Sequence, residues 1–184
     1  MNKKGFTLIE MLTTTAIMVV IFGLLALIFG RATTIHKIVR SGGDAENFGI
    51  YLMNTIVYGP GISREKGLIG TQPFTYTELP LSSTVLQFKD ANNNVVAYTL
   101  STSTNTLSYG TVDLKPTWAK DRGMEVLPES GFYYYNDTVG TVPATGTDPV
   151  RVVGIKLMLK STLQNIAEAV TLYRCVRIRN QIDF

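Results

Sequence analysis

Cysteine and histidine are almost absent from this 184-residue chain, which has one of each, Cys175 and His36. A single cysteine excludes an intrachain disulfide. Cys175 lies in a strand-like apolar run, where we expect a small buried side chain. His36 has no cysteine or acidic cluster near it in sequence, so we expect no metal ion there. No nucleophile–base pair, phosphate loop or paired-carboxylate pattern stands out, and we therefore expect neither an enzyme nor a cofactor.

Charge is missing from one long stretch near the N-terminus. Between Phe6 and Gly30 the only charged residue is Glu10. A helix rises 1.5 Å per residue, so residues 6–30 span roughly 37 Å, which is enough to cross a hydrocarbon core of about 30 Å with some tilt. We expect this segment to cross a membrane or to be buried in another apolar environment.

Two interpretations leave part of this segment unexplained. A secretory signal peptide has a short apolar region followed by a small-residue cleavage site. Here the apolar run is too long, and Gly30-Arg31-Ala32-Thr33 is a poor site of that kind. A plain transmembrane anchor fits the length but gives Glu10 no purpose, although an acid within a bilayer is costly unless it is paired or lies near the interface.

The octet Lys3-Lys4-Gly5-Phe6-Thr7-Leu8-Ile9-Glu10 resembles the class III signal of type IV pilins and type II secretion pseudopilins. The resemblance implies that the prepilin peptidase cuts after Gly5 and methylates the new N-terminal residue, Phe6. It also implies that Glu10 pairs with the N-terminal amine of a neighbouring subunit in a filament. Such a pair is physically reasonable, because a buried carboxylate and a buried ammonium become tolerable only together.

The formal net charge of +3 belongs partly to the leader. Loss of the basic leader residues Lys3 and Lys4 leaves about +1 (3 − 2), which is a weak basis for a nucleic-acid partner. The resemblance implies other partners: pseudopilins or pilins bound through the N-terminal helix, the prepilin peptidase and the inner-membrane assembly platform. It also implies a single-pass protein of the cytoplasmic membrane whose C-terminal domain is periplasmic until a filament forms. The positive-inside rule does not show this orientation, because Arg31, Lys37 and Arg40 flank the other end of the segment.

The helix is predicted to continue to about residue 57. Apolar residues recur at helical spacing, bordered by Tyr51 and Thr55; they are Ile35, Ile38, Val39, Phe48, Leu52 and Ile56. Ser41-Gly42-Gly43-Asp44 predicts a kink or short break, with Asp44 available to cap the second half. Tyr58-Gly59-Pro60-Gly61 should end the helix.

Segments of alternating apolar and polar residues follow, and they predict an antiparallel sheet with one solvated face. The expected strands are 84–89, 96–100, 106–109, 132–135, 151–160 and 168–180. Residues 62–81 and 139–149 are expected to be loops, and 112–120 is ambiguous. The other face of the sheet should pack on residues 45–57 of the helix. The expected fold is therefore α+β and pilin-like.

The expected organisation has four parts. A leader peptide covers residues 1–5, the transmembrane half of the helix residues 6–30 and its extramembrane half residues 31–57. A β-rich globular domain covers residues 58–184, which is enough chain for a core of its own.

Other candidate sites have ordinary structural interpretations. Asp90, Asn92, Asn93 and Asn94 offer oxygen atoms, but their spacing fits no calcium loop and predicts an Asx-rich hairpin turn. Strand propensity explains the aromatic run 132–135, although a partner surface stays open as an alternative. Arg177 and Arg179 should share a solvated strand face.

Three C-terminal segments resemble the J-type minor pseudopilins and related minor pilins: Phe132–Asp137, Val153–Leu157 and Val176–Asn180. This resemblance implies a structural subunit, associated with the tip of a type II secretion pseudopilus. The alternative is a minor pilin of a type IV pilus used for adhesion, motility or DNA uptake. A membrane-anchored periplasmic domain that merely uses this signal is a third hypothesis. The chain departs from many major pilins, which close a C-terminal loop with two cysteines.

Overall fold

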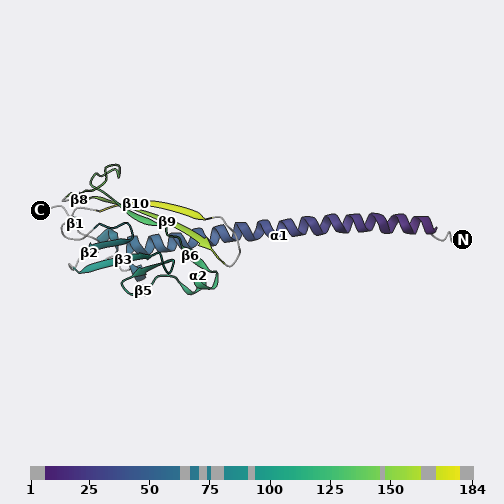
Figure 1. Cartoon of the computed structure of the whole chain (residues 1–184), viewed down its shortest axis with the longest axis horizontal. Helices are drawn as coiled ribbons and strands as arrows, with labels where there is room; N and C mark the ends of the chain where they lie inside the picture. The colour runs from purple at the N-terminus through teal and green to yellow at the C-terminus, as the bar shows by residue number, and fades with distance from the viewer. Residues whose placement is uncertain are drawn as a thin grey trace. The chain divides into compact units, whose positions relative to one another are not determined.

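The computed structural model describes residues 7–62, 67–70, 74–75, 81–90, 94–145, 148–162 and 169–178. The chain divides into two compact units, Met1–Arg40 and Ser41–Phe184. Helix α1, Leu8–Tyr58, begins in the first unit and ends in the second (Figure 1).

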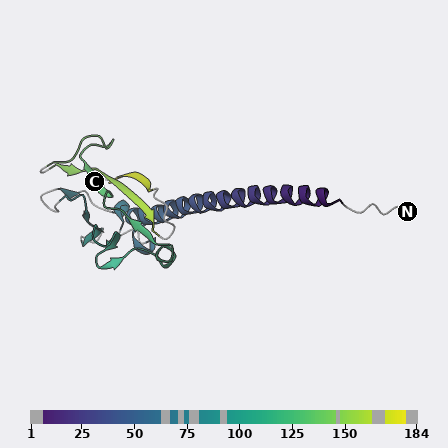
Figure 2. The same cartoon turned by 45° about the vertical axis from the view of Figure 1, so that its right-hand side comes forward.

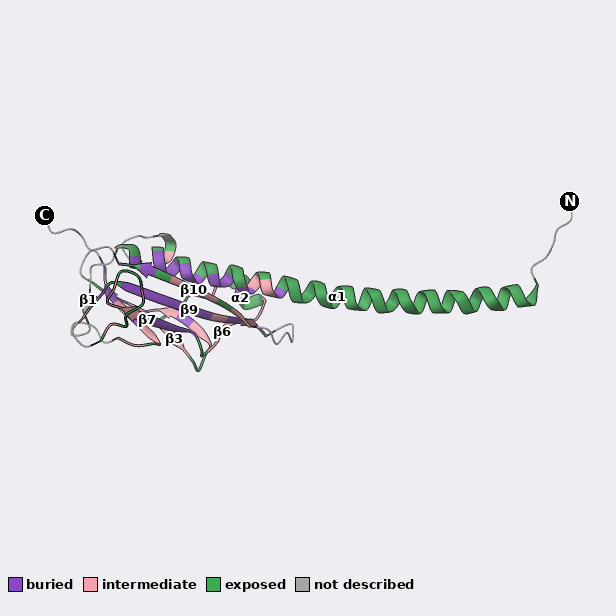
Figure 3. Ribbon diagram, turned by 90° about the horizontal axis from the view of Figure 1, so that it is seen from above, coloured by how far each residue is buried: buried purple, intermediate pink, exposed green. Residues whose placement is uncertain are grey.

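The first unit contains only helix in its described part, and all of it is exposed. Residues 7–40 carry no buried side chain, and Figure 3 shows this part of α1 in green throughout. α1 contains a stretch that is long and apolar enough to cross a membrane. An uncovered apolar surface of this extent requires lipid or neighbouring helices to cover it.

The predicted break at Ser41-Gly42-Gly43-Asp44 is wrong, because α1 continues through all four residues. Each helix-interior glycine costs about 1 kcal/mol relative to alanine. Burial of the turns that follow, with Phe48, Leu52 and Ile56 fully buried, outweighs that cost. Asp44 does not cap a helix; its carboxylate instead accepts a hydrogen bond from the guanidinium of Arg122 and forms an ion pair with it.

The predicted end of the helix is confirmed. Gly59 has a φ of 86°, a left-handed conformation that favours glycine, and its N–H donates to the carbonyl of Thr55 at 2.9 Å. α1 therefore ends at Tyr58, and the short 3-10 helices η1 (Pro60–Ile62) and η3 (Leu68–Gly70) follow.

The described strands form three antiparallel sheets. One has four strands in the order of the chain: β2 (Val85–Lys89), β3 (Val95–Ser101), β4 (Thr106–Tyr109) and β5 (Val112–Asp113). A two-stranded sheet pairs β1 (Phe74–Thr75) with β8 (Pro149–Val150).

The remaining sheet is built on its longest strand, β9 (Val152–Ser161). One edge of β9 pairs with β10 (Val170–Arg177) over the whole length of that strand. The other edge is shared end to end by β7 (Gly131–Tyr135) and β6 (Met124–Val126). β7 and β6 therefore pair with successive stretches of the same edge of β9.

The α+β class and the six predicted strands are confirmed, whereas the expectation of one sheet is wrong. The ambiguous stretch 112–120 contains β5 and the short helix α2 (Thr117–Asp121). The unexpected strands β1, β6 and β8 have only two or three residues each. Such short strands cannot show an alternating pattern in the sequence.

Both four-stranded sheets contact the last turns of α1, and Figures 1 and 2 show the strands of this unit gathered around those turns. From β3, the hydroxyl of Tyr98 donates to the carbonyl of Thr55 at 3.0 Å. From β9 and β10, Leu159 and Leu172 approach Gly49 so closely that a Cβ there would lie 2.5 and 2.2 Å from their Cδ1 atoms. The predicted packing on residues 45–57 is confirmed.

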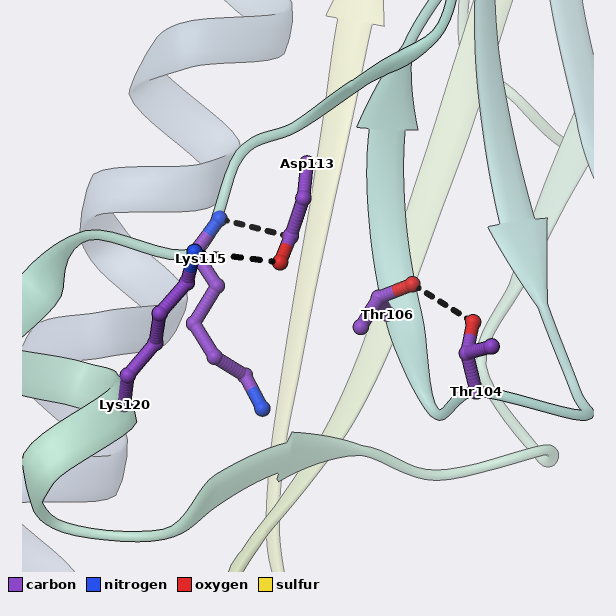
Figure 4. A network of polar contacts seen from close by, with 5 residues as sticks. All are labelled: Thr104, Thr106, Asp113, Lys115 and Lys120. Atoms are coloured by element: carbon purple, nitrogen blue, oxygen red, sulfur yellow. Dashed lines mark hydrogen bonds and ion pairs between the residues drawn. The ribbon is translucent and has the colours of Figure 1, made fainter.

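Polar contacts order the segment between β5 and α2 (Figure 4). Oδ1 of Asp113 accepts the backbone N–H of Lys115 at 2.9 Å, and Oδ2 lies 3.7 Å from Nζ of Lys120. Thr104 and Thr106 join their hydroxyls at 2.8 Å across the turn between β3 and β4. Exposed contacts of this kind each contribute less than about 1 kcal/mol, so they define local geometry more than stability.

Candidate assembly site

The residues that the sequence pattern selects for processing and assembly lie at the start of α1. Lys3, Lys4, Gly5 and Phe6 lie outside the described residues. Glu10 is described, is fully exposed and stands in the first turn of the helix.

Glu10 and Thr7 form a reciprocal pair of hydrogen bonds that starts α1. Oε2 of Glu10 accepts the backbone N–H of Thr7 at 2.8 Å and its hydroxyl at 2.9 Å. The backbone N–H of Glu10 donates in return to Oγ1 of Thr7 at 3.3 Å. This is a capping box, in which two otherwise unsatisfied donors at a helix start find partners. The sequence analysis missed it, although a threonine three residues before a glutamate ahead of an apolar run is its signal.

The capping box uses only one of the two carboxylate oxygens of Glu10. Among the described residues, Oε1 of Glu10 makes no hydrogen bond. The geometry therefore holds the carboxylate in one orientation and leaves Oε1 without a hydrogen bond from any described residue. A negative charge at a helix N-terminus is also favoured by the helix dipole.

The three threonines after Glu10 carry no unsatisfied hydroxyl into this apolar stretch. Thr13 donates to the carbonyl of Ile9 at 2.9 Å, Thr15 donates to that of Met11 at 3.0 Å, and Thr14 donates to that of Glu10. Hydroxyls bonded one turn back are compatible with a lipid environment, where unsatisfied polar groups are costly. Glu10 is thus the only charged group within the described part of residues 6–30.

The oxygen-rich segment after β2 contributes to a hairpin turn. Asp90 is buried, its Oδ1 accepts the backbone N–H of Asn94 at 2.8 Å, and its own N–H donates to the carbonyl of Asn94 at 2.9 Å. Asn92 and Asn93 lie outside the described residues. His36 is exposed on α1, and within the described ranges no group of three or more His, Cys, Asp or Glu could hold a metal ion.

The prediction that Cys175 is buried is wrong. In β10 the even-numbered residues point inward and the odd-numbered residues Thr171, Tyr173, Cys175 and Arg177 are exposed. Sγ of Cys175 lies 3.5 Å from the hydroxyl of Tyr173. The alternation that places Val176 inside therefore places its neighbour outside. Arg177 is on the solvated face, as predicted, and Arg179 lies outside the described residues.

The aromatic run divides between the two faces of its strand, β7. Phe132 is buried, and Tyr134 donates its hydroxyl to the carbonyl of Ser82 at 2.9 Å; burial raises the pKa of Tyr134 well above its ordinary value of 10.0. Tyr133 and Tyr135 point outward, and the hydroxyl of Tyr135 lies 3.1 Å from that of Tyr173. Strand formation and core packing account for the inward half of the run.

An open groove of about 390 Å³ lies in the second unit beside the end of α1 and along β10. Its described lining residues are Val57, Tyr58, Ile69, Arg174, Cys175, Val176 and Arg177. Arg174 donates to Oδ1 of Asn54 at 3.0 Å and lies 5.9 Å from the ring centroid of Tyr58. Because this described lining contains no histidine or carboxylate that could activate Cys175, it offers no nucleophile–base pair.

Residues 1–28 match the family model described as the prokaryotic N-terminal methylation motif. Comparisons with curated proteins and with solved structures find no match. The matched segment contains the capping box and the first part of α1. The rest of α1 and the antiparallel sheets follow it, in an α+β architecture. The motif and this architecture together support the expected resemblance to the type IV pilin-like proteins.

Proposed function

We propose that this protein is a minor pseudopilin, a structural subunit at or near the tip of a type II secretion pseudopilus, and that it resembles the J-type subunits. The observation that carries the proposal is the orientation of Glu10, the one charge in an apolar helix that bears the methylation motif. A carboxylate held at the helix start with one oxygen unused suits a bond between subunits. The coarser role, a subunit of a pilin-like filament, would hold equally for a minor pilin.

In this proposal, the prepilin peptidase cleaves after Gly5 and methylates Phe6, removing Lys3 and Lys4 with the leader 1–5. Residues 6–30 store the subunit in the cytoplasmic membrane, and residues 31–57 and 58–184 lie on the periplasmic side. The assembly platform then moves the helix into the filament, where Glu10 pairs with the amine of a neighbouring Phe6. Pairing cancels two buried charges at once, which favours one register of assembly.

The proposed role is assembly, without a catalytic reaction. The described lining of the groove beside β10 gives Cys175 no histidine or carboxylate that could activate its thiol. The partners are therefore the other subunits and the membrane machinery that processes and assembles them.

Three substitutions separate the two roles that the geometry gives Glu10. Glu10→Gln keeps an oxygen that can accept the Thr7 bonds but removes the charge, whereas Thr7→Ala removes the cap and keeps the charge. If pairing between subunits is the role, Glu10→Gln and Glu10→Ala should both abolish incorporation into filaments, while Thr7→Ala should reduce it only mildly. Incorporation is measured by immunoblotting of sheared filaments against equal membrane levels of each variant. Normal incorporation of Glu10→Gln would contradict the proposed pairing.

A further inference from the structure

Residues 31–40 form a basic zone within the first unit that the proposed function leaves unused. Arg31, His36, Lys37 and Arg40 lie here, and the sequence has no acidic residue between Glu10 and Asp44. All four basic side chains are exposed on α1. Among the described residues of the first unit, the only carboxylate is that of Glu10, which lies at the opposite end of the helical stretch.

The position of this zone along the helix matches the thickness of a bilayer. Arg31 is the first charged residue after Glu10, 21 positions further on (31 − 10). At 1.5 Å per residue this separation is about 32 Å, against about 30 Å for a hydrocarbon core. When Glu10 lies at one boundary of the core, Arg31 lies at the other.

Residues 35–40 of this zone are also amphipathic around the helix axis, whereas Arg31 falls on their apolar side, between Ile38 and Ile35. At about 100° per residue, His36, Lys37 and Arg40 fall within one arc of about 100°. Ile35, Ile38 and Val39 fall within an arc of similar width on the opposite side, and Ile35 and Val39 are 61% and 68% exposed. A basic arc of this kind suits contact with anionic headgroups.

We propose that Arg31, Lys37 and Arg40 bind the phosphate groups of anionic lipids and hold the stored subunit at a fixed depth in the membrane. The proposal rests on the proposed function, because it concerns the subunit before it enters a filament. Arginine and lysine side chains reach headgroup phosphates while their methylene stems stay against apolar surface.

Processing makes this arrangement one-sided. Removal of Lys3 and Lys4 leaves the basic side chains near the membrane on the side of the globular unit alone. Extraction of the helix toward that side then moves no basic side chain across the hydrocarbon core, where such a charge is expensive. The phosphate contacts define the depth from which extraction begins.

The test compares lipid preference in the full chain, reconstituted into vesicles of phosphatidylcholine with or without phosphatidylglycerol. Spin-labelled analogues of the two lipids report their relative association with the protein by electron spin resonance. The processed wild type should prefer phosphatidylglycerol by about fivefold or more, the effect of a single such charge contact. The variant R31Q/K37Q/R40Q should show almost no preference.

A matched control variant removes an equal number of positive charges, three, from the second unit. K115Q/K156Q/K160Q should keep the wild-type preference, because these lysines belong to the second unit. Equal preference in the wild type and in R31Q/K37Q/R40Q would overturn the proposal. Carbonate washing of the same vesicles distinguishes failure of this proposal from failure of the proposed function. If the wild-type chain washes off the vesicles, membrane storage is contradicted. If it stays on the vesicles but does not prefer the anionic lipid, only the headgroup contact is contradicted.

Discussion

At the scale of single residues, Glu10 combines a local role with a role between molecules. Its Oε2 is used by Thr7 and its Oε1 is not used by any described residue. The local role is that of a helix cap, which gives otherwise unsatisfied donors at the helix start a partner. The role between molecules depends on charge, which a cap does not require. The substitutions Glu10→Gln and Thr7→Ala therefore affect different steps.

Thr7→Ala should loosen the first turn of α1. Loss of a cap worth about 1 kcal/mol predicts about fivefold faster hydrogen exchange for the amide of Glu10, which donates to the Thr7 hydroxyl. The measurement is exchange followed by mass spectrometry on the full chain in detergent micelles. Thr34→Ala is the control, since Thr34 bonds to the carbonyl of Gly30 inside the helix. Unchanged exchange at the helix start would mean that the capping box does not persist in solution.

Asp137 should stay ionised in unusually acidic solution. The hydroxyl of Thr141, followed by the backbone N–H groups of Val142, Thr141 and Gly140, lowers the pKa of Asp137 from 3.8 to about 2. Because the pKa is lower in the folded state, the stabilisation by this carboxylate is complete above about pH 4 and is lost as the pH falls toward 2.

NMR titration of the Asp137 carboxyl carbon should therefore give a midpoint near 2. Thr141→Val should raise that midpoint toward 3.8, because it removes the largest cause of the shift. Thr145→Val should leave it unchanged, since the Thr145 hydroxyl bonds to Asp148 instead. A wild-type midpoint near 3.8 would show that these bonds do not form in solution.

At the scale of elements, the continuity of α1 through residues 41–44 is decided by burial. Two consecutive glycines favour a break locally. The turns that follow bury Ala45, Phe48 and Leu52 against strands that come more than 30 residues later in the chain. A tertiary contact of this kind is invisible to local propensity. For the same reason, the local sequence does not show the ion pair between Asp44 and Arg122, which are 78 positions apart.

The pair Asp44–Arg122 should couple α1 to the end of α2. A double-mutant cycle with Asp44→Asn and Arg122→Met should give an interaction energy of about 1 kcal/mol, as for other partly exposed ion pairs. The measurement is urea unfolding of the full chain in detergent. The pair Asp113 and Lys120, in which both side chains are more exposed, should give a smaller value. Additive single effects at Asp44 and Arg122 would contradict the observed ion pair.

Gly67 should tolerate no side chain. A Cβ at Gly67 would lie 2.4 to 2.5 Å from backbone atoms of Val57, Tyr58 and Gly59, which cannot rotate away as a side chain can. Gly67→Ala should therefore destabilise the chain by about 1–3 kcal/mol, the range for overpacked sites. Gly42→Ala is the matched control: it meets open space within the helix and should stabilise by about 0.5–1 kcal/mol. Urea unfolding of both variants is the measurement, and equal stability would contradict the close approach of Gly67 to the helix end.

The strands show how far a single sequence predicts such a fold. Alternation in residues 151–160 and 168–180 predicts β9 and β10, because more and less buried residues alternate through Ile155–Ser161 of β9 and through β10. The division of the strands into separate sheets depends on the pairing partners of β9, and nothing in its own residues shows them. The prediction that Cys175 is buried was wrong for a simpler reason: its odd position in β10 already placed its side chain on the exposed face of the strand.

At the scale of the whole molecule, two units with different surfaces belong to one chain. In the first, an apolar helical stretch is followed by a basic zone and no described side chain is buried, whereas the second buries a core of its own. This division suits a subunit that is held in a membrane by one unit and presents the other unit outside it. The N-terminal motif was predictable because it is a local pattern of eight residues. Its biological context is not encoded in the packing of the second unit.

The most direct test of this account is the intact mass and N-terminal sequence of the membrane-extracted protein, made with and without active prepilin peptidase. With the peptidase, the chain should lack Met1–Gly5 and begin at Phe6 with one added methyl group. Without it, the leader residues before Phe6 should remain. An unprocessed N-terminus in the presence of active peptidase would contradict the filament role and leave only an anchored domain.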